Sequence, residues 1–132
     1  MDPRGGNTEQ QARYFADRAV LDGAELTARQ KQLARAVLEV VLLAGLPPYN
    51  IEAAADGEET GVALVPESRG ALRVVWQQDP QAEHSLPAEQ CDDVQAAMNQ
   101  ALRAVLSAHQ FPLADGPLGE PPVVLASSLL SK

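Results

Sequence analysis

The chain has 132 residues and a mass of 14.0 kDa, which is the size of about one domain. Apolar residues make up 45% of it, enough for one modest core and too many for a mainly disordered chain. The longest apolar run, Val40–Leu46, is far shorter than the roughly 20 residues that cross a bilayer.

The formal net charge is −8, and it is unevenly distributed. Residues 1–45 hold six acidic and six basic side chains, so residues 46–132 carry the whole excess. An acidic surface repels phosphate groups, and we therefore expect no direct binding to nucleic acid or to an anionic membrane. The acidity itself has two interpretations, which are plain solubility and a face for a basic partner.

The cellular compartment follows from two features of the sequence. Cys91 is the single cysteine, which excludes an intramolecular disulfide and fits a reducing environment. The chain does not open with a basic segment followed by an apolar one, as a secretory signal would. We therefore expect a cytoplasmic protein, and the abundance of Ala, Arg, Val and Leu with few lysines is typical of GC-rich bacterial genomes.

The N-terminal third predicts a tail and two helices. Residues 1–7 contain a proline and two glycines and are expected to be flexible. Thr8 opens a first helix that stops at Asp22-Gly23, with a thin stripe of mostly alanine. Thr27 opens a second, strongly apolar helix, with Gln30 completing a capping box and Gly45 suited to its C-terminal end.

The middle of the chain changes to the period of β-strands. A short first strand over 51–55 is weakly indicated, and an exposed acidic turn follows it. Residues 62–65 and 71–77 predict two strands joined by a hairpin turn at 66–70. In the second of these strands Leu72, Val74 and Trp76 alternate with Arg73, Val75 and Gln77, which predicts a sheet with one face on the core.

A long helix is predicted over residues 88–109. We expect its buried stripe to consist of Cys91, Val94, Met98, Ala101, Leu102 and Val105. Its polar face is expected to consist of Asp92, Asp93, Asn99, Gln100, Arg103 and Ser107.

These elements predict an α+β fold: two N-terminal helices, a small antiparallel sheet of two to four strands, and one long C-terminal helix packed on one sheet face. Residues 8–112 would form the single domain, and 113–132 a segment rich in proline and glycine with an edge strand over 123–126. One face of the sheet lacks an obvious cover, so we expect a homodimer.

Catalytic and metal-binding motifs are absent from the sequence, which has no phosphate-binding loop, nucleophile elbow, dinucleotide fingerprint or zinc-protease motif. Cys91 lies among acidic neighbours that oppose a thiolate, and His109 suits the end of a helix. The acidic turn at 56–59 lacks the ligand pattern of an EF-hand. We therefore predict no catalytic residue, no metal site and no cofactor.

The first functional hypothesis is a non-enzymatic protein-binding module, acting as a dimeric accessory, regulatory or chaperone-like subunit. In its bulk properties, small size and acidity, the chain is similar to bacterial type III secretion chaperones, which are small, acidic, dimeric α/β proteins. The apolar and aromatic residues expected to contact a protein partner are Tyr14, Phe15, Trp76, Val123 and Leu125.

The alternative is a small-molecule-binding protein or cofactor-free enzyme with a pocket between the sheet and the long helix. Its expected lining residues are Glu52, Arg73, Trp76 and His84.

A third hypothesis, nucleic-acid binding, is disfavoured. The order of helix, strands and helix over residues 27–109 resembles the double-stranded-RNA-binding domain. That family presents lysines at the start of its last helix, where this chain has Glu89, Asp92 and Asp93.

Overall fold

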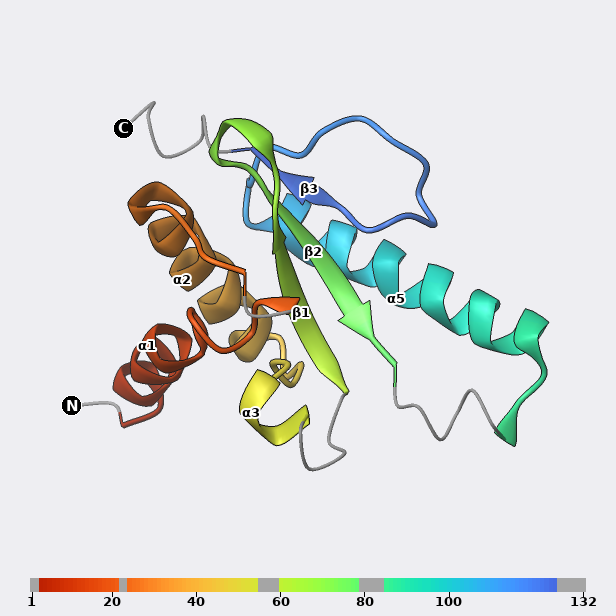
Figure 1. The fold of residues 1–132 in the computed structure, drawn as a ribbon, viewed down its shortest axis with the longest axis horizontal. Helices are drawn as coiled ribbons and strands as arrows, with labels where there is room; N and C mark the ends of the chain where they lie inside the picture. The colour runs from red at the N-terminus through yellow and green to blue at the C-terminus, as the bar shows by residue number, and fades with distance from the viewer. Residues whose placement is uncertain (1–2, 22–23, 55–59, 79–84, 126–132) are drawn as a thin grey trace.

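The computed structural model describes residues 3–21, 24–54, 60–78 and 85–125. The strands form one antiparallel sheet in the order β1-β2-β3, and the predicted α+β fold is confirmed (Figure 1). In chain order the elements are α1 (Pro3–Phe15), α2 (Ala28–Leu43), α3 (Ile51–Ala54), β1 (Gly61–Pro66), the 3-10 turn η2 (Ser68–Gly70), β2 (Leu72–Gln77), α5 (Ala88–Ala108) and β3 (Val123–Val124).

Helix α1 differs from its predicted bounds at both ends. It begins at Pro3, so the helix includes residues 3–7, which the sequence assigned to a tail. Proline suits the first position of a helix, where its missing N–H is not needed. The helix ends at Phe15 rather than at Asp22, because the following backbone pairs with β1: the N–H of Leu64 donates to the Ala19 carbonyl at 2.8 Å.

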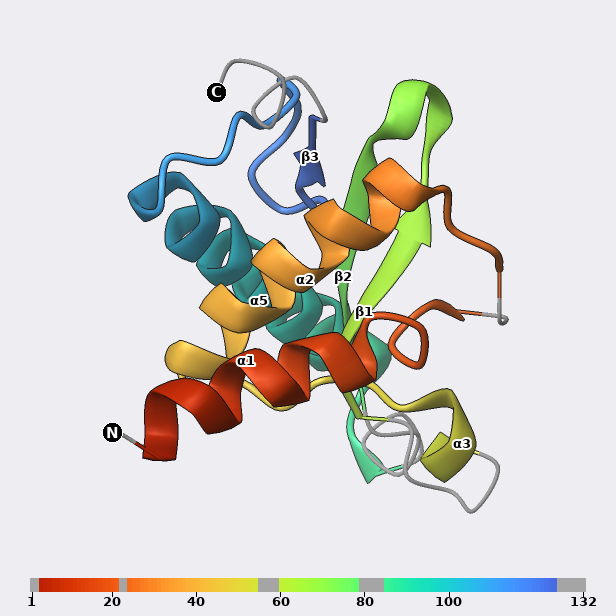
Figure 2. The same ribbon diagram turned by 90° about the vertical axis from the view of Figure 1, so that its left-hand side faces the viewer.

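Helix α1 packs on α2 through small side chains. Ala12 and Ala16 are almost completely buried and belong to the core cluster. Alanine lets two helix backbones approach closely, so the thin stripe expected from the sequence serves as a contact with α2. Figure 2 shows α1 lying along the side of α2 that faces away from α5.

Helix α2 has the ends that its sequence predicts. Thr27 Oγ1 accepts the N–H of Gln30 at 3.1 Å, and Gln30 Oε1 accepts the N–H of Thr27 at 3.0 Å. At the other end Gly45 takes a left-handed φ of 85°, and the N–H of Leu46 donates back to the Val41 carbonyl at 3.1 Å.

The weakly indicated strand over 51–55 is wrong. Residues Ile51–Ala54 form the short helix α3, and Asn50 Oδ1 accepts the N–H of Glu52 at its start. The alanines that weakened the strand prediction favour helix, and an asparagine at this point caps one. The expected acidic turn that follows lies almost entirely in 55–59, outside the described residues.

The hairpin of β1 and β2 has the predicted alternation. Leu64 pairs with Val74 and Val62 with Trp76, so these four side chains share one sheet face. This inner face is covered by α2 and α5, and its members in the core cluster are Val62, Leu64, Leu72, Val74 and Val124, packed with Leu33, Val37, Leu38, Leu102 and Leu106.

Both edges of the sheet are occupied by this chain's own backbone. Along β1, Val62 exchanges hydrogen bonds with residues 47–49, and Leu64 bonds to residue 19. Along β3, the N–H of Ala114 donates to the Val123 carbonyl at 2.9 Å, and the N–H of Leu125 donates to the Pro112 carbonyl at 2.9 Å. These bonds occupy the edge groups that an added strand would need.

Candidate functional site

Helix α5 is rotated relative to the orientation predicted from its apolar stripe. Asn99, expected on the polar face, is only 3% exposed and donates to the Gly119 carbonyl at 2.9 Å. Gln95 likewise donates to the Trp76 carbonyl at 2.8 Å. These two amides satisfy one backbone carbonyl of β2 and one of the segment after α5, and they face inward together with Leu102 and Leu106.

The rotation places part of the predicted buried stripe in solvent, which corrects the prediction for Val94 and Ala101. Val94 is 43% exposed, and Ala101 is exposed as well. We call the exposed row opposite the buried residues the α5 outer face, and it consists of Val94, Ala97, Ala101, Ala104 and Ala108.

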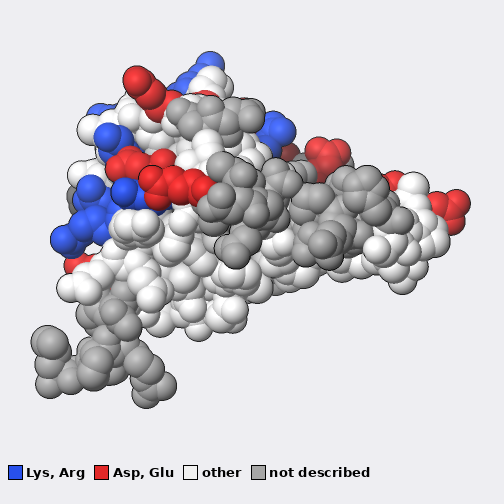
Figure 3. Space-filling model, turned by 60° about the horizontal axis from the view of Figure 1, so that its bottom comes forward, with Lys and Arg blue, Asp and Glu red and all other residues white. Residues whose placement is uncertain are grey.

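The α5 outer face is free of charge in a chain whose net charge is −8. Between Val94 and Ala108 the helix has one charged residue, Arg103, which is half-buried and lies on another side. The acidic residues Glu89, Asp92 and Asp93 are exposed at the start of the helix. Figure 3 shows an uncharged area along the lower side of the molecule, between clustered charges on the left and acidic atoms at the right-hand tip.

The aromatic residues predicted to bind a partner through α1 are engaged within the chain. Tyr14 is 48% exposed, but the Arg18 guanidinium lies 3.9 Å from the centre of its ring. Phe15 meets the Tyr14 ring edge to face at 5.0 Å and packs against the core. Arg18 also bonds to the Tyr14 carbonyl and to Glu52, so this corner of the molecule is held together by its own contacts.

The other three predicted partner-binding residues lie elsewhere. Trp76 is half-buried and packs against the core cluster. Val123 stands opposite Arg73, on the outer sheet face, and Leu125 follows β3. Since α1 and β3 lie on opposite sides of the sheet hairpin, the structure does not bring the five residues together into one surface (Figure 1).

The residues predicted for a ligand pocket are also dispersed. Glu52 on α3 is exposed and pairs with Arg18 at 3.2 Å. Arg73 on β2 pairs with Glu67 at 3.1 Å, and Trp76 belongs to the core side of the sheet. His84 lies outside the described residues. Only Arg73 of the four lines a cavity among those described here.

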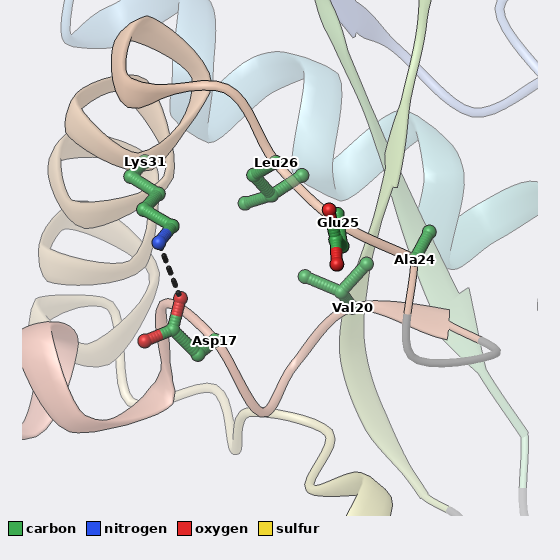
Figure 4. Close-up of a pocket in the computed structure, with 6 residues that line it drawn as sticks. All are labelled: Asp17, Val20, Ala24, Glu25, Leu26 and Lys31. Carbon is green, nitrogen blue, oxygen red and sulfur yellow. Dashed lines mark ion pairs between the residues drawn. The ribbon is translucent and has the colours of Figure 1, made fainter.

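One cavity, of about 390 Å³, lies along the α1–α2 connection beside the start of α2 (Figure 4). At one side Lys31 Nζ approaches Asp17 Oδ1 at 3.9 Å. It is therefore not the pocket expected between the sheet and the long helix. Its lining residues are Asp17, Val20, Ala24, Glu25, Leu26 and Lys31.

A second cavity, of about 210 Å³, is lined by residues of α5, β2 and β3 and by the segment between α5 and β3. Arg103 of α5 and Arg73 of β2 both line it, and residues 114–116 and 120–121 complete its wall with Val123. Arg103 Nη1 donates to the Ala114 carbonyl at 3.4 Å, whereas its Nε is buried and has no hydrogen-bond partner in the structure. The hydrophobic pattern of α5 predicts Arg103 on the polar, solvent-facing side of the helix. Its position as the single charged residue in the middle of α5 is the feature of the sequence that could have pointed to this cavity.

Within residues 3–21, 24–54, 60–78 and 85–125, no three His, Cys, Asp or Glu side chains gather closely enough to hold a metal ion. None of the helices described there is long and apolar enough to cross a bilayer. Cys91 is half-buried in the first turn of α5, with its Sγ 4.0 Å from the Leu86 carbonyl.

Comparison with protein-family models, curated sequences and solved structures found no match for the chain. Its function is therefore inferred from the residues and their geometry.

Proposed function

We propose that this protein is a non-enzymatic protein-binding module that pairs with a second copy of itself through the α5 outer face. The observation that carries the proposal is the uncharged, apolar outer face of α5, from Val94 to Ala108, in an otherwise acidic chain. The exposed side of a solvated helix normally carries charged residues, and an apolar exposed side is typical of a protein contact.

The arrangement of the outer face favours a second copy as its partner. Val94 and Ala108 are equally far from Ala101 in sequence, so a two-fold axis at Ala101 would place Val94 of one copy opposite Ala108 of the other in an antiparallel pair. The separations of four and three residues are those of a helix-pairing seam, and alanine allows close approach of the two backbones. The same axis brings Asp93, in the second turn of α5, toward His109 of the second copy.

The closed sheet edges support a helix contact over strand addition. An incoming strand would have to displace the hydrogen bonds that residues 47–49 make to β1, or those that residues 112–114 make around β3. The α5 outer face has no such bonds to displace. Its row spans about 21 Å of helix, which is small beside a standard protein interface, so we expect a dissociation constant in the micromolar range.

The test is the mass of the full chain in solution, measured by sedimentation equilibrium from about 5 to 500 μM. We expect the weight-average mass to rise from the 14.0 kDa of one chain toward twice that value. Ala101→Glu would place two like charges against each other on the axis, and we expect it to weaken association at least 100-fold, or about 2.7 kcal/mol.

The matched control is Gln32→Glu, which adds the same charge at an exposed position on α2. It should leave the association unchanged, apart from the small effect of overall charge. A concentration-independent mass of one chain would overturn the proposal, and so would equal weakening by the two variants.

A further inference from the structure

The cavity at Arg103 has a wall held by backbone and amide hydrogen bonds. The segment 113–122 crosses it, with Ala114 bonded to Val123 and the Pro122 carbonyl accepting the N–H of Val74 at 2.9 Å. Asn99 of α5 holds the Gly119 carbonyl, and a Cβ at Gly119 would lie 3.4 Å from that of Ala96. The wall of the cavity is therefore held in place by contacts between α5, β2 and this segment.

The Arg103 charge is incompletely compensated. Its Nε–H is removed from solvent without an acceptor, and its Nη1 has only the long bond of 3.4 Å to Ala114. Asp115 and Glu120 line the same cavity, yet neither forms an ion pair with Arg103 within 4.0 Å. A guanidinium partly removed from water and without a counter-ion attracts an anion strongly.

We infer that this cavity binds a small monocarboxylate that also carries an amino or hydroxyl group. The guanidinium fork of Arg103 matches a carboxylate in shape, and Arg73, whose charge is paired with Glu67 at 3.1 Å, also lines the wall. Asp115 and Glu120 can accept hydrogen bonds from the amino or hydroxyl group, and their charges disfavour a dianion such as phosphate. The volume of about 210 Å³ corresponds to about seven water molecules, which limits the ligand to roughly ten heavy atoms.

The test is a titration of the isotopically labelled full chain in which binding is monitored by the NMR chemical shifts of its backbone amides. The probes are L-serine, L-lactate, acetate and inorganic phosphate. We expect saturable shifts with L-serine and L-lactate in residues 114–120 and around Arg103, and at least fivefold weaker binding of acetate, which lacks the second group. Tighter binding of phosphate than of L-serine and L-lactate would overturn the assigned ligand class.

Two variants test the role of Arg103. Arg103→Gln should abolish the shifts, and Arg103→Lys, which keeps the charge but loses the fork, should weaken binding at least tenfold. Arg13→Gln, at an exposed arginine of α1, is the control and should bind as the wild type does. The spectra themselves report whether each variant is folded. The inference is wrong if neither L-serine nor L-lactate shifts these amides, or if a folded Arg103→Gln variant binds as tightly as the control.

Discussion

Gln30 is predicted to be the most important polar side chain for the stability of the fold. It is 4% exposed, and its Nε2 donates to the carbonyls of Glu67 and Ala71, each at 3.1 Å. Its Oε1 also accepts the N–H of Thr27 at 3.0 Å. One side chain therefore joins the start of α2 to the hairpin between β1 and β2.

Replacing it by a side chain of similar length, Gln30→Met, removes all three bonds, while the Ala71 carbonyl still accepts the N–H of Glu67 at 2.9 Å. At about 1 kcal/mol for each bond, we expect the free energy of unfolding to fall by about 3 kcal/mol, a large part of the 5–15 kcal/mol typical of a domain. Urea unfolding followed by the fluorescence of Trp76, the single tryptophan, measures this change.

The control for this prediction is Gln32→Met on the exposed side of the same helix, where we expect a change within about 0.5 kcal/mol. A loss below 1 kcal/mol for Gln30→Met would refute the reasoning. Gln30→Glu gives an independent check, because it keeps an acceptor for Thr27 and turns a carboxylate toward two carbonyls. Burial would raise the pKa of the introduced carboxyl above its ordinary value of about 4.3, so stability should be lost as the pH rises through the raised pKa and recover below it.

Two further predictions concern backbone geometry and the orientation of α5. In Gly61→Ala the new Cβ would lie 2.6 Å from the Tyr49 nitrogen, and we expect a loss of about 3 kcal/mol or more in urea unfolding. Gly45→Ala also introduces a side chain at positive φ, but into open space, and should cost only about 1 kcal/mol, so equal losses would contradict the geometry. Asn99→Ala should lower the free energy of unfolding by about 1–2 kcal/mol, because the Gly119 carbonyl loses its hydrogen-bond donor. The control Gln100→Ala, at an exposed position on the same helix, should change the free energy of unfolding by less than about 0.5 kcal/mol. Indistinguishable values for the two variants would mean that Asn99 does not anchor the helix.

Local signals were sufficient to predict most of the fold. The capping box of Thr27 and Gln30 and the glycine at 45 define α2 because the chemistry of helix ends is local. The alternation through Leu72, Val74 and Trp76 predicted the inner face of β2 for a similar reason. The sequence pattern was insufficient where a residue far along the chain determines the local structure. The end of α1 is an example, because the backbone that follows the helix pairs with β1 through Val20 and Leu64.

The candidate functional surfaces depend even more than the fold on contacts between residues that are far apart in the sequence. The orientation of α5 is set by Gln95 and Asn99, whose amides bond to carbonyls of β2 and of the segment after the helix. A hydrophobic pattern treats both residues as polar and therefore directs them to solvent. The same rotation exposes Val94 and Ala101 and turns Arg103 into a cavity, so neither feature could be derived from periodicity alone.

The most direct measurement of the proposed pairing is a disulfide cross-link across the predicted two-fold axis. In a Cys91→Ala background, Ala101→Cys would place one thiol of each copy on the axis, and mild oxidation should join two chains rapidly into a dimer. Gln32→Cys in the same background, at an exposed position on α2, should cross-link slowly and only through random collisions. Equal rates for the two cysteines, or no dimer from Ala101→Cys at concentrations where the wild-type chain associates, would contradict pairing through the α5 outer face.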